Sequence, residues 1–387
     1  MPHIPFTSLL REMSLSNITA LSTIQRMIQS LKQDVLAGLM ASLLLAGCSS
    51  NRAYEGVNAP VITSGQGAAT PSLPPVSGLK LTDAHFHLVD FLQRTDGIQA
   101  ALAAMDAAGV TDTMVTGMPL VKKWSKEYVR QPLYYLEDES PVYWYSATDV
   151  LVARAVLSAP ESERHRFHPF ITGFNPTDRN AVDHIKRMVE WYPGLWQGIG
   201  EVITHHDELT ALTPGEISRP DNIALDPVFD FAAEHDLPVS LHSNIGAVWI
   251  REPIFLPELE TTLKKHSKTR FIWCHAGIGR RLVVPSLVPE LRRLLGTYRN
   301  LWVDLSWVVF ENYIAQDGKL QPDWVELVKA FPDRFMIGSD IVARFGKYTA
   351  EIRKYDLLLN ALPEEAAKRV GHDNFLSVLP AGARGKE

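Results

Sequence analysis

The sequence predicts an α/β fold in which eight parallel strands, each followed by a helix, close into a (β/α)8 barrel, also called a TIM barrel. Apolar segments of strand length alternate with amphipathic segments of helix length, and this alternation is typical of a parallel sheet. Eight such units lie between residues 81 and 340, a length that suits a closed barrel. An open, doubly wound sheet would need a phosphate-binding G-x-G-x-x-G after its first strand, and the sequence has none there.

The size and composition of the chain suit one large domain. It has 387 residues, of which 46% are hydrophobic and 21% charged, so a sizeable core can form. The formal net charge is −6, so the chain as a whole offers no basic field to attract nucleic acid. Its two cysteines, Cys48 and Cys274, lie in very different surroundings and are not expected to form a disulfide.

The segment before the barrel contains a short apolar run that ends at a cysteine. The run is too short for a comfortable transmembrane helix and suits a signal peptide. Leu45-Ala46-Gly47-Cys48 resembles the lipobox of bacterial lipoproteins, which implies cleavage before Cys48 and lipidation of its thiol. Ser49, rather than an aspartate, implies by the same resemblance an address on the periplasmic face of the outer membrane.

The chain is therefore expected to have three parts. They are a signal peptide with a possible upstream extension (1–47), a lipidated flexible tether rich in Ser, Gly, Ala and Pro (48–79), and the barrel domain (80–380). In this interpretation the membrane is reached only through the lipid anchor. The alternative is an uncleaved N-terminal helix.

Each expected strand is an apolar run that ends at or near a polar residue. Runs of this length, bounded by turn residues and alternating with helices, are typical of buried parallel strands. The eight expected strands span residues 81–87, 113–117, 167–174, 196–201, 238–242, 271–275, 301–306 and 334–340.

The intervening helices are predicted from apolar residues spaced three or four apart, together with residues that start or end a helix. Thr95 is expected to cap the first helix and Gly109 to end it. Asp226 is expected to cap a later helix that has Pro227 in its first turn, and Gly296 to end another. The apolar helix positions include Ile98, Leu102, Met105, Val182, Ile185, Val189, Val228, Phe231, Leu287, Leu291, Leu294, Val325, Val328, Ile352 and Leu358.

The least regular stretch of the barrel domain, residues 118–146, follows the second strand and is rich in Tyr and Trp. Loops of this length in a compact domain are commonly lids or binding loops. An aromatic surface excursion without a binding role is the alternative.

Six residues of metal-ligand type occupy the ends of five expected strands. His85 and His87 alternate with Phe86 on the first strand, so both imidazoles point to one face. Carboxyl ends of parallel barrel strands meet at one mouth, so these side chains are expected to converge. Four imidazoles and two carboxylates suit zinc or a similar divalent ion, without a thiolate. The six are His85, His87, Glu201, His242, His275 and Asp340.

This order of ligands resembles the amidohydrolase superfamily, particularly its amidohydrolase-related and TatD-like branches. The resemblance covers residues 80–376 and includes His372-Asp373-Asn374-Phe375, which is similar to the family's closing helix. It implies that His85, His87 and Asp340 hold one metal ion, that His242 and His275 hold a second, and that Glu201 bridges them. Many family members carry a carboxylated lysine where this chain has Glu201.

The resemblance further implies a metal-dependent hydrolase of a small-molecule ester, lactone, amide or phosphoester. A metal-activated hydroxide would attack, and Asp340 would take its proton. With one ion held by His85, His87, His242 and Asp340, His275 would instead donate a proton, and the same site would suit a nonoxidative decarboxylase. The sequence leaves both arrangements open.

Other residues near the expected mouth are candidates for lesser roles. Asp83 lies one pleat below His85 and is expected to orient a liganding imidazole, or to belong to a polar layer inside the barrel. Arg280 and Arg251 are candidates for binding a substrate carboxylate or phosphate. His205 and His206 are expected to be loop residues rather than ligands.

Two further classes of function compete with the small-molecule enzyme. A TatD-like nuclease is disfavoured by the negative net charge and the lipoprotein address. An envelope protein with a purely structural metal would have every coordination position filled by protein, whereas a catalytic site keeps one open. The sequence identifies neither the substrate nor the oligomeric state.

Overall fold

The computed structural model describes residues 78–122 and 141–383. The predicted signal peptide, Cys48 and the predicted tether up to residue 77 lie outside this part of the chain. All eight predicted strands are present within it, the first and the last each as two short pieces. They are β1 (Leu81–Asp83) with β2 (Phe86–Val89), β3 (Val110–Gly117), β6 (Phe167–Ile171), β7 (Gly198–Ile203), β8 (Val239–His242), β9 (Phe271–Trp273), β10 (Leu301–Asp304), and β13 (Phe335–Met336) with β14 (Ile341–Val342).

These strands form one parallel sheet that closes on itself. Each strand pairs with its neighbours in chain order, from β2 through β3, β6, β7, β8 and β9 to β10. The last strand completes the ring, because β13 pairs with β10 while β14 pairs with β2. Between the two pieces, the Asp340 N–H donates to the His85 carbonyl over 2.8 Å. The predicted (β/α)8 barrel is confirmed.

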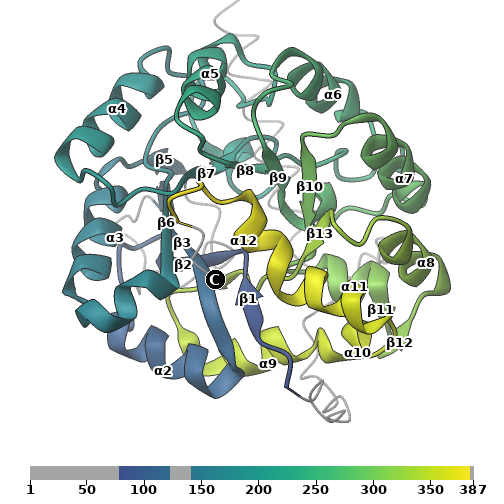
Figure 1. Ribbon diagram of the computed structural model, residues 1–387. Helices are drawn as coiled ribbons and strands as arrows, with labels where there is room; N and C mark the ends of the chain where they lie inside the picture. The colour runs from purple at the N-terminus through teal and green to yellow at the C-terminus, as the bar shows by residue number, and fades with distance from the viewer. Residues whose placement is uncertain (1–77, 123–140, 384–387) are drawn as a thin grey trace, which may run out of the picture. The chain divides into compact units, whose positions relative to one another are not determined.

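Helices follow the strands and surround them (Figure 1). Their buried positions are the apolar ones that the sequence spacing indicates, such as Ile98, Leu102 and Met105 on α2. The main helices are α2 (Ile98–Ala108), α3 (Ala147–Ser158), α4 (Ala181–Trp191), α5 (Asp226–Glu234), α6 (Leu256–Lys265), α7 (Leu287–Thr297), α8 (Pro322–Ala330), α9 (Tyr348–Arg353), α10 (Asp356–Leu359), α11 (Glu364–Lys368) and α12 (Asn374–Val378). Within the described ranges, none of the helices has the length and apolar character needed to span a bilayer.

The C-terminal helix α12 closes the amino-terminal end of the barrel. In Figure 1 it crosses the ring of strands. Phe375 and Val378 of α12 pack with Met114, Phe170 and Met336 in one fully buried apolar cluster. This cluster seals the barrel below the level of the predicted ligands, so a substrate must approach from the carboxyl ends of the strands.

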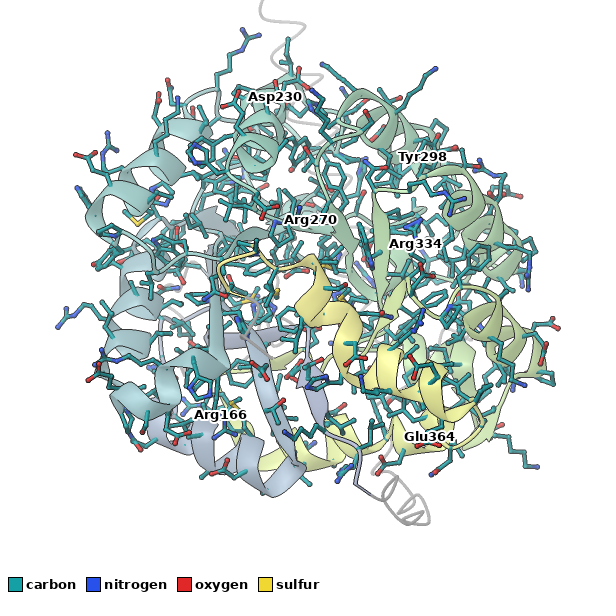
Figure 2. The ribbon with its side chains drawn as sticks, in the orientation of Figure 1. Arg166, Asp230, Arg270, Tyr298, Arg334 and Glu364 are labelled. Carbon is teal, nitrogen blue, oxygen red and sulfur yellow. The ribbon has the colours of Figure 1, made fainter. Side chains whose placement is uncertain are left out.

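Arginines tie down the amino-terminal ends of three strands. Arg166, Arg270 and Arg334 each precede the first residue of a strand, which is phenylalanine in all three cases. Their guanidinium groups donate to backbone carbonyls, as Arg166 does to Val110 over 2.9 Å and Arg334 to Leu301 over 2.9 Å. Figure 2 labels all three around the centre of this face. Their role at this end of the barrel is structural.

Three helix boundaries differ from the sequence prediction. Gly97, not Thr95, is the cap of α2, and the Thr95 hydroxyl instead accepts the Gly97 N–H over 3.0 Å. Asp226 is the first residue of α5 rather than its cap. Gly296 lies inside α7, which ends at Thr297, because an internal glycine costs a helix only about 1 kcal/mol. The left-handed Gly109 ends α2 as predicted, with φ of 70°.

The two ends of the long aromatic loop pair with each other. β4 (Leu120–Lys122) and β5 (Val142–Trp144) form an antiparallel ladder, and the residues between them lie outside the described part. Leu120 and Val142 pack with Ile203 at the end of β7, so this ladder sits at the carboxyl-terminal side of the barrel. The choice between a lid and a surface excursion stays open.

Two glycine substitutions are expected to have opposite effects on stability. A β-carbon on Gly198 of β7 would lie 2.4 Å from the Phe170 ring, so Gly198→Ala should destabilise the fold by about 1–3 kcal/mol through overpacking. Gly296 has open space around it, and Gly296→Ala should stabilise α7 by about 0.5–1 kcal/mol. Thermal unfolding of both variants tests this, and a shift of both in the same direction would contradict it.

Candidate metal centre

The structure brings all six predicted ligand residues together at the carboxyl ends of the barrel strands. His85 and His87 come from the first strand, and the other four come from the ends of β7, β8, β9 and β13. Their side chains are buried, with exposures of 4% or less, except for Asp340 at 12%. Asp340 is thus the one member of the group that reaches toward solvent.

Two groups of possible ligand atoms share His85: one comes from His85, His87 and Asp340 and the other from His85, Glu201 and His275, and within each group the atoms lie within 4.8 Å of one another. His85 Nε2 and His87 Nε2 are 3.1 Å apart, and each faces Asp340 Oδ1, at 3.4 and 3.3 Å. Glu201 Oε2 lies 3.7 Å from His85 Nε2 and 3.4 Å from His87 Nε2. In tetrahedral zinc sites with ligands at about 2.0–2.1 Å, neighbouring donors are about 3.3 Å apart. The observed separations therefore fit a divalent ion among these atoms.

Glu201 turns its second oxygen to the other two histidines. Oε1 lies 2.8 Å from His242 Nδ1 and 3.6 Å from His275 Nε2. The carboxylate thus stands between two pairs of imidazoles, which is the placement that a bridging ligand requires. The 2.8 Å contact is a hydrogen bond, however, and is shorter than the separation of about 3.3 Å expected between two ligands of one zinc ion.

Both ring nitrogens of His242 already face oxygen atoms. Nδ1 faces Glu201, and Nε2 lies 3.2 Å from Asn244 Oδ1. The Asn244 amide group donates to Asp207 over 3.0 Å, which fixes its oxygen toward the imidazole. His242 therefore holds Glu201 in place in this arrangement.

The electrostatics of the centre favour a bound cation. Burial alone would lower the pKa of His85 and His87, yet the surrounding carboxylates outweigh burial and raise both pKa values. Burial alone would raise the pKa of Asp340, but His85 and its neighbours hold it at about 2. The pKa of Glu201 is likewise held well below its usual value, by His85 and His242. Ionised carboxylates at these distances favour positive charge beside them, which protons on the imidazoles or a bound cation can supply.

Two buried residues of the centre were missed by the sequence analysis. Asp304 ends β10 and places Oδ2 2.7 Å from His85 Nδ1, and Ser306 places its hydroxyl 2.8 Å from His275 Nδ1. Asp304 follows an apolar run at the end of a strand, as the six predicted ligands do, and that position is the signal that could have identified it.

Of the two roles predicted for Asp83, its contacts favour the polar layer inside the barrel over the orientation of an imidazole ring. Its oxygens accept the backbone N–H groups of His85 and Ser339, over 3.0 and 2.8 Å, and the Ser339 hydroxyl over 2.6 Å. Burial raises the pKa of Asp83 to about 6. Asp83 therefore joins the backbones of the first and last strands, while Asp304 contacts the liganding ring.

The residues that carry the centre leave regular strand geometry. His275, Trp307 and Asp340 all have positive φ, at 54°, 58° and 47°. Such backbone conformations are uncommon for residues other than glycine and cluster at functional sites. Here they occur where the chain leaves β9, β10 and β13, and they turn the chain at the barrel mouth.

The two predicted substrate arginines lie in different surroundings. Arg280 places its guanidinium over the Trp307 ring at 5.1 Å, and that ring packs against His275 at 5.1 Å between centroids. Arg280 also lies 3.7 Å from Glu208. Arg251 is exposed, and the structure does not bring it to the centre. Only Arg280 remains a candidate at the mouth.

The two loop histidines differ as well. His205 forms a 2.6 Å ion-pair contact with Glu258 and stacks on Phe255, away from the ligand group. His206 stacks on His242 with ring centroids 4.6 Å apart, and burial together with His242 holds its pKa well below the usual value. Its Nδ1 accepts the Glu208 N–H over 3.1 Å. His206 is therefore an uncharged side chain that lines the centre.

Comparisons with known proteins agree with this architecture. A family model described as amidohydrolase matches residues 82–379. Similar solved structures include a TIM-barrel protein from Bordetella bronchiseptica described as uncharacterized, with 14% identity and a TM-score of 0.47, covering 75% of this chain and 84% of that one. Another is 2,6-dihydroxybenzoate decarboxylase from Rhizobium, with 13% identity, a TM-score of 0.45, and coverage of 78% and 98%. Dihydroorotase from Campylobacter jejuni has 19% identity, a TM-score of 0.45, and coverage of 78% and 83%. No curated protein matches the chain significantly.

The raised histidine pKa values predict that metal affinity increases with pH. In the metal-free protein, the surrounding carboxylates raise the pKa values of His85 and His87, so an arriving ion competes with protons up to a higher pH than at ordinary histidines. Zn²⁺ affinity should therefore rise by about tenfold per pH unit for each displaced proton, for example between about pH 6 and about pH 8. Competition with a chelating dye measures the affinity, and equal affinities at the two pH values would contradict the prediction.

Proposed function

The chain belongs to the amidohydrolase family and is an enzyme of the amidohydrolase superfamily, and we propose that it is a metal-dependent hydrolase of small-molecule esters, lactones, amides or phosphoesters. The observation that carries this proposal is the group of four donor atoms from His85, His87, Glu201 and Asp340, at separations that suit a divalent ion. Zinc is the ion we propose, because nitrogen and carboxylate donors in this number suit it.

The four donors would hold one ion, with the remaining residues around it. Once bound, the ion would supply a Lewis acid that polarises the scissile carbonyl or phosphoryl group and makes a water molecule acidic enough to attack it. We favour one ion over two, because His242 Nδ1 lies 2.8 Å from Glu201 Oε1, a hydrogen-bond separation shorter than the separation of about 3.3 Å expected between two ligands of one zinc ion. The task of His242 in this arrangement is to fix the orientation of the Glu201 carboxylate.

Asp340 is the proposed proton acceptor. Its Oδ1 faces the paired imidazoles, its Oδ2 lies 3.9 Å from His275 Nε2, and its side chain is the most exposed of the ligand group. A carboxylate at the open edge of the centre can receive the proton of an attacking water molecule without leaving its ligand position. His275 lies next to it and is placed to accept that proton or to contact the substrate.

The substrate is proposed to enter between Trp307 and the loop after β7. The Trp307 ring contacts His275, and the Arg280 guanidinium group lies over the Trp307 ring, 5.1 Å from its centroid. A guanidinium group at this position can bind a carboxylate or phosphate group of the substrate. The alternative reaction, nonoxidative decarboxylation, shares the one-ion arrangement and would use His275 as a proton donor.

We also propose that the chain is a lipid-anchored envelope protein, on the strength of Leu45-Ala46-Gly47-Cys48 and the apolar run before it. Replacement of the modified thiol in Cys48→Ser should prevent labelling by a fatty acid and shift the protein from the detergent phase to the aqueous phase. Partitioning of labelled cells measures this. Wild-type protein found unlabelled in the aqueous phase would contradict it.

Loss of the proton acceptor is expected to abolish turnover without unfolding the protein. Asp340→Asn should lower kcat/KM by about 10²- to 10⁴-fold, the range for removal of a general base. The control is Asp96→Asn, which removes a carboxylate paired with Arg344 outside the centre and should leave activity unchanged.

The measurement is hydrolysis of a panel of lactones, esters and phosphotriesters by metal-analysed protein, before and after removal of the metal. Metal-free protein with full activity would contradict the proposal. Carbon dioxide release from aromatic or enoic acids, without hydrolysis of the panel, would replace hydrolysis by decarboxylation.

A further inference from the structure

A buried chain of hydrogen bonds runs behind the centre, on the side away from the donor atoms. Asp304 Oδ2 lies 2.7 Å from His85 Nδ1 and 2.8 Å from the Ser306 hydroxyl, which in turn lies 2.8 Å from His275 Nδ1. All four residues are at most 2% exposed. One carboxylate oxygen is therefore connected to two imidazoles, directly on one side and through a hydroxyl on the other.

The direction of each hydrogen bond follows from the number of available hydrogens. Asp304 Oδ1 accepts the Ser306 backbone N–H over 2.6 Å, which leaves Oδ2 to accept from the two groups beside it. The Ser306 hydroxyl has a single hydrogen and donates it to Asp304, so its oxygen must accept from His275. Both imidazoles thus carry a hydrogen on Nδ1, and both direct Nε2 into the centre.

We propose that Asp304 is a positioning residue that sets the tautomer of two histidines at once, His85 directly and His275 through Ser306. The proposal rests on the proposed function, because a metal ligand or proton acceptor needs an Nε2 lone pair that faces the centre. It assigns His275, when neutral, as an acceptor or ligand rather than a proton donor. It also gives a reason for the full burial of Asp304. This carboxylate contacts His85 Nδ1 and the Ser306 hydroxyl, and it does not face the donor atoms that would hold the metal ion.

The substitution Asp304→Asn is expected to invert both tautomers. The Ser306 N–H fixes the amide oxygen at the Oδ1 position, so the amide NH₂ takes the Oδ2 position and donates to its neighbours. His85 Nδ1 must then accept, and its hydrogen moves to Nε2. The Ser306 hydroxyl then accepts a hydrogen bond from the amide NH₂ and donates its own hydrogen to His275 Nδ1. The hydrogen of the His275 ring therefore also moves to Nε2. An aspartate-to-asparagine change acts on a catalytic histidine in this way in serine proteases.

Variants of Ser306 separate the two arms. Ser306→Ala removes the link to His275 and leaves the contact between Asp304 and His85. Ser306→Thr retains a hydroxyl and should restore the His275 signal.

The experiment is ¹⁵N nuclear magnetic resonance of histidine-labelled protein, with His85 and His275 assigned through single substitutions to glutamine. Spectra are recorded at alkaline pH without metal, where the rings are neutral, and again with Zn²⁺ bound. Wild type should show Nδ1–H on both rings. Asp304→Asn should move the hydrogen to Nε2 on both rings, and Ser306→Ala should alter His275 alone. Zn²⁺ affinity of Asp304→Asn should fall by about 10- to 100-fold.

Asp149→Asn is the matched control. Asp149 is also fully buried and accepts two backbone N–H groups and a histidine, none of which belongs to the ligand group. It should leave the ring signals and Zn²⁺ affinity unchanged. Unprotonated Nδ1 atoms in wild type, or ring signals that do not respond to Asp304→Asn, would overturn the inference. A wild type that shows Nδ1–H but binds no Zn²⁺ would instead defeat the proposed function and leave the tautomer assignment standing.

Discussion

Charge compensation inside the barrel is the constraint on which the rest of the centre depends. Glu201, Asp304 and Asp340 bring three carboxylates into a nearly water-free volume, where an unpaired charge would be very costly. Oxygens of all three carboxylates face imidazoles or other hydrogen-bond donors. The carboxylates hold the imidazoles in position and keep the pKa values of His85 and His87 high, and the imidazoles keep Glu201 and Asp340 ionised. The same balance leaves one place where a divalent cation fits.

The barrel supplies the rigid frame for this balance. At one end, α12 and the apolar layer beneath it exclude water, and arginines clamp the strand starts. At the other end, the strands release their chains into loops with unusual backbone angles at His275, Trp307 and Asp340. The polar centre is therefore bounded by buried apolar side chains at the amino-terminal end of the barrel and opens at the carboxyl-terminal end. This arrangement lets a strongly charged group exist inside the domain.

The sequence predicted the strands and their polar ends well, because both depend on short-range patterns that a buried parallel strand imposes. It did not predict Asp304 and Ser306 as part of the centre, because their importance lies in a contact with His85 across 219 residues of chain. The second contact of His242 depends on how Asn244 is held by Asp207, which no local spacing encodes. The caps of α2 and α5 differed by one or two residues, because neither helix begins at a residue whose side chain bonds the first backbone N–H groups, which is the feature the prediction relied on. Arg251 was a candidate for substrate binding only because it lies in a loop after a barrel strand. No sequence rule predicts the direction in which a loop side chain points.

The divided last strand has a consequence for the order in which the protein folds. Asp340 lies between the two pieces that join β10 to β2, and the neighbouring Ser339 binds Asp83 across 256 residues of chain. Ring closure and completion of the donor set are therefore the same event. A polypeptide that ends before Asp340 therefore lacks both a donor of the centre and the last contact that closes the ring. Binding of a metal ion by the complete donor set would stabilise the closed ring over any open form.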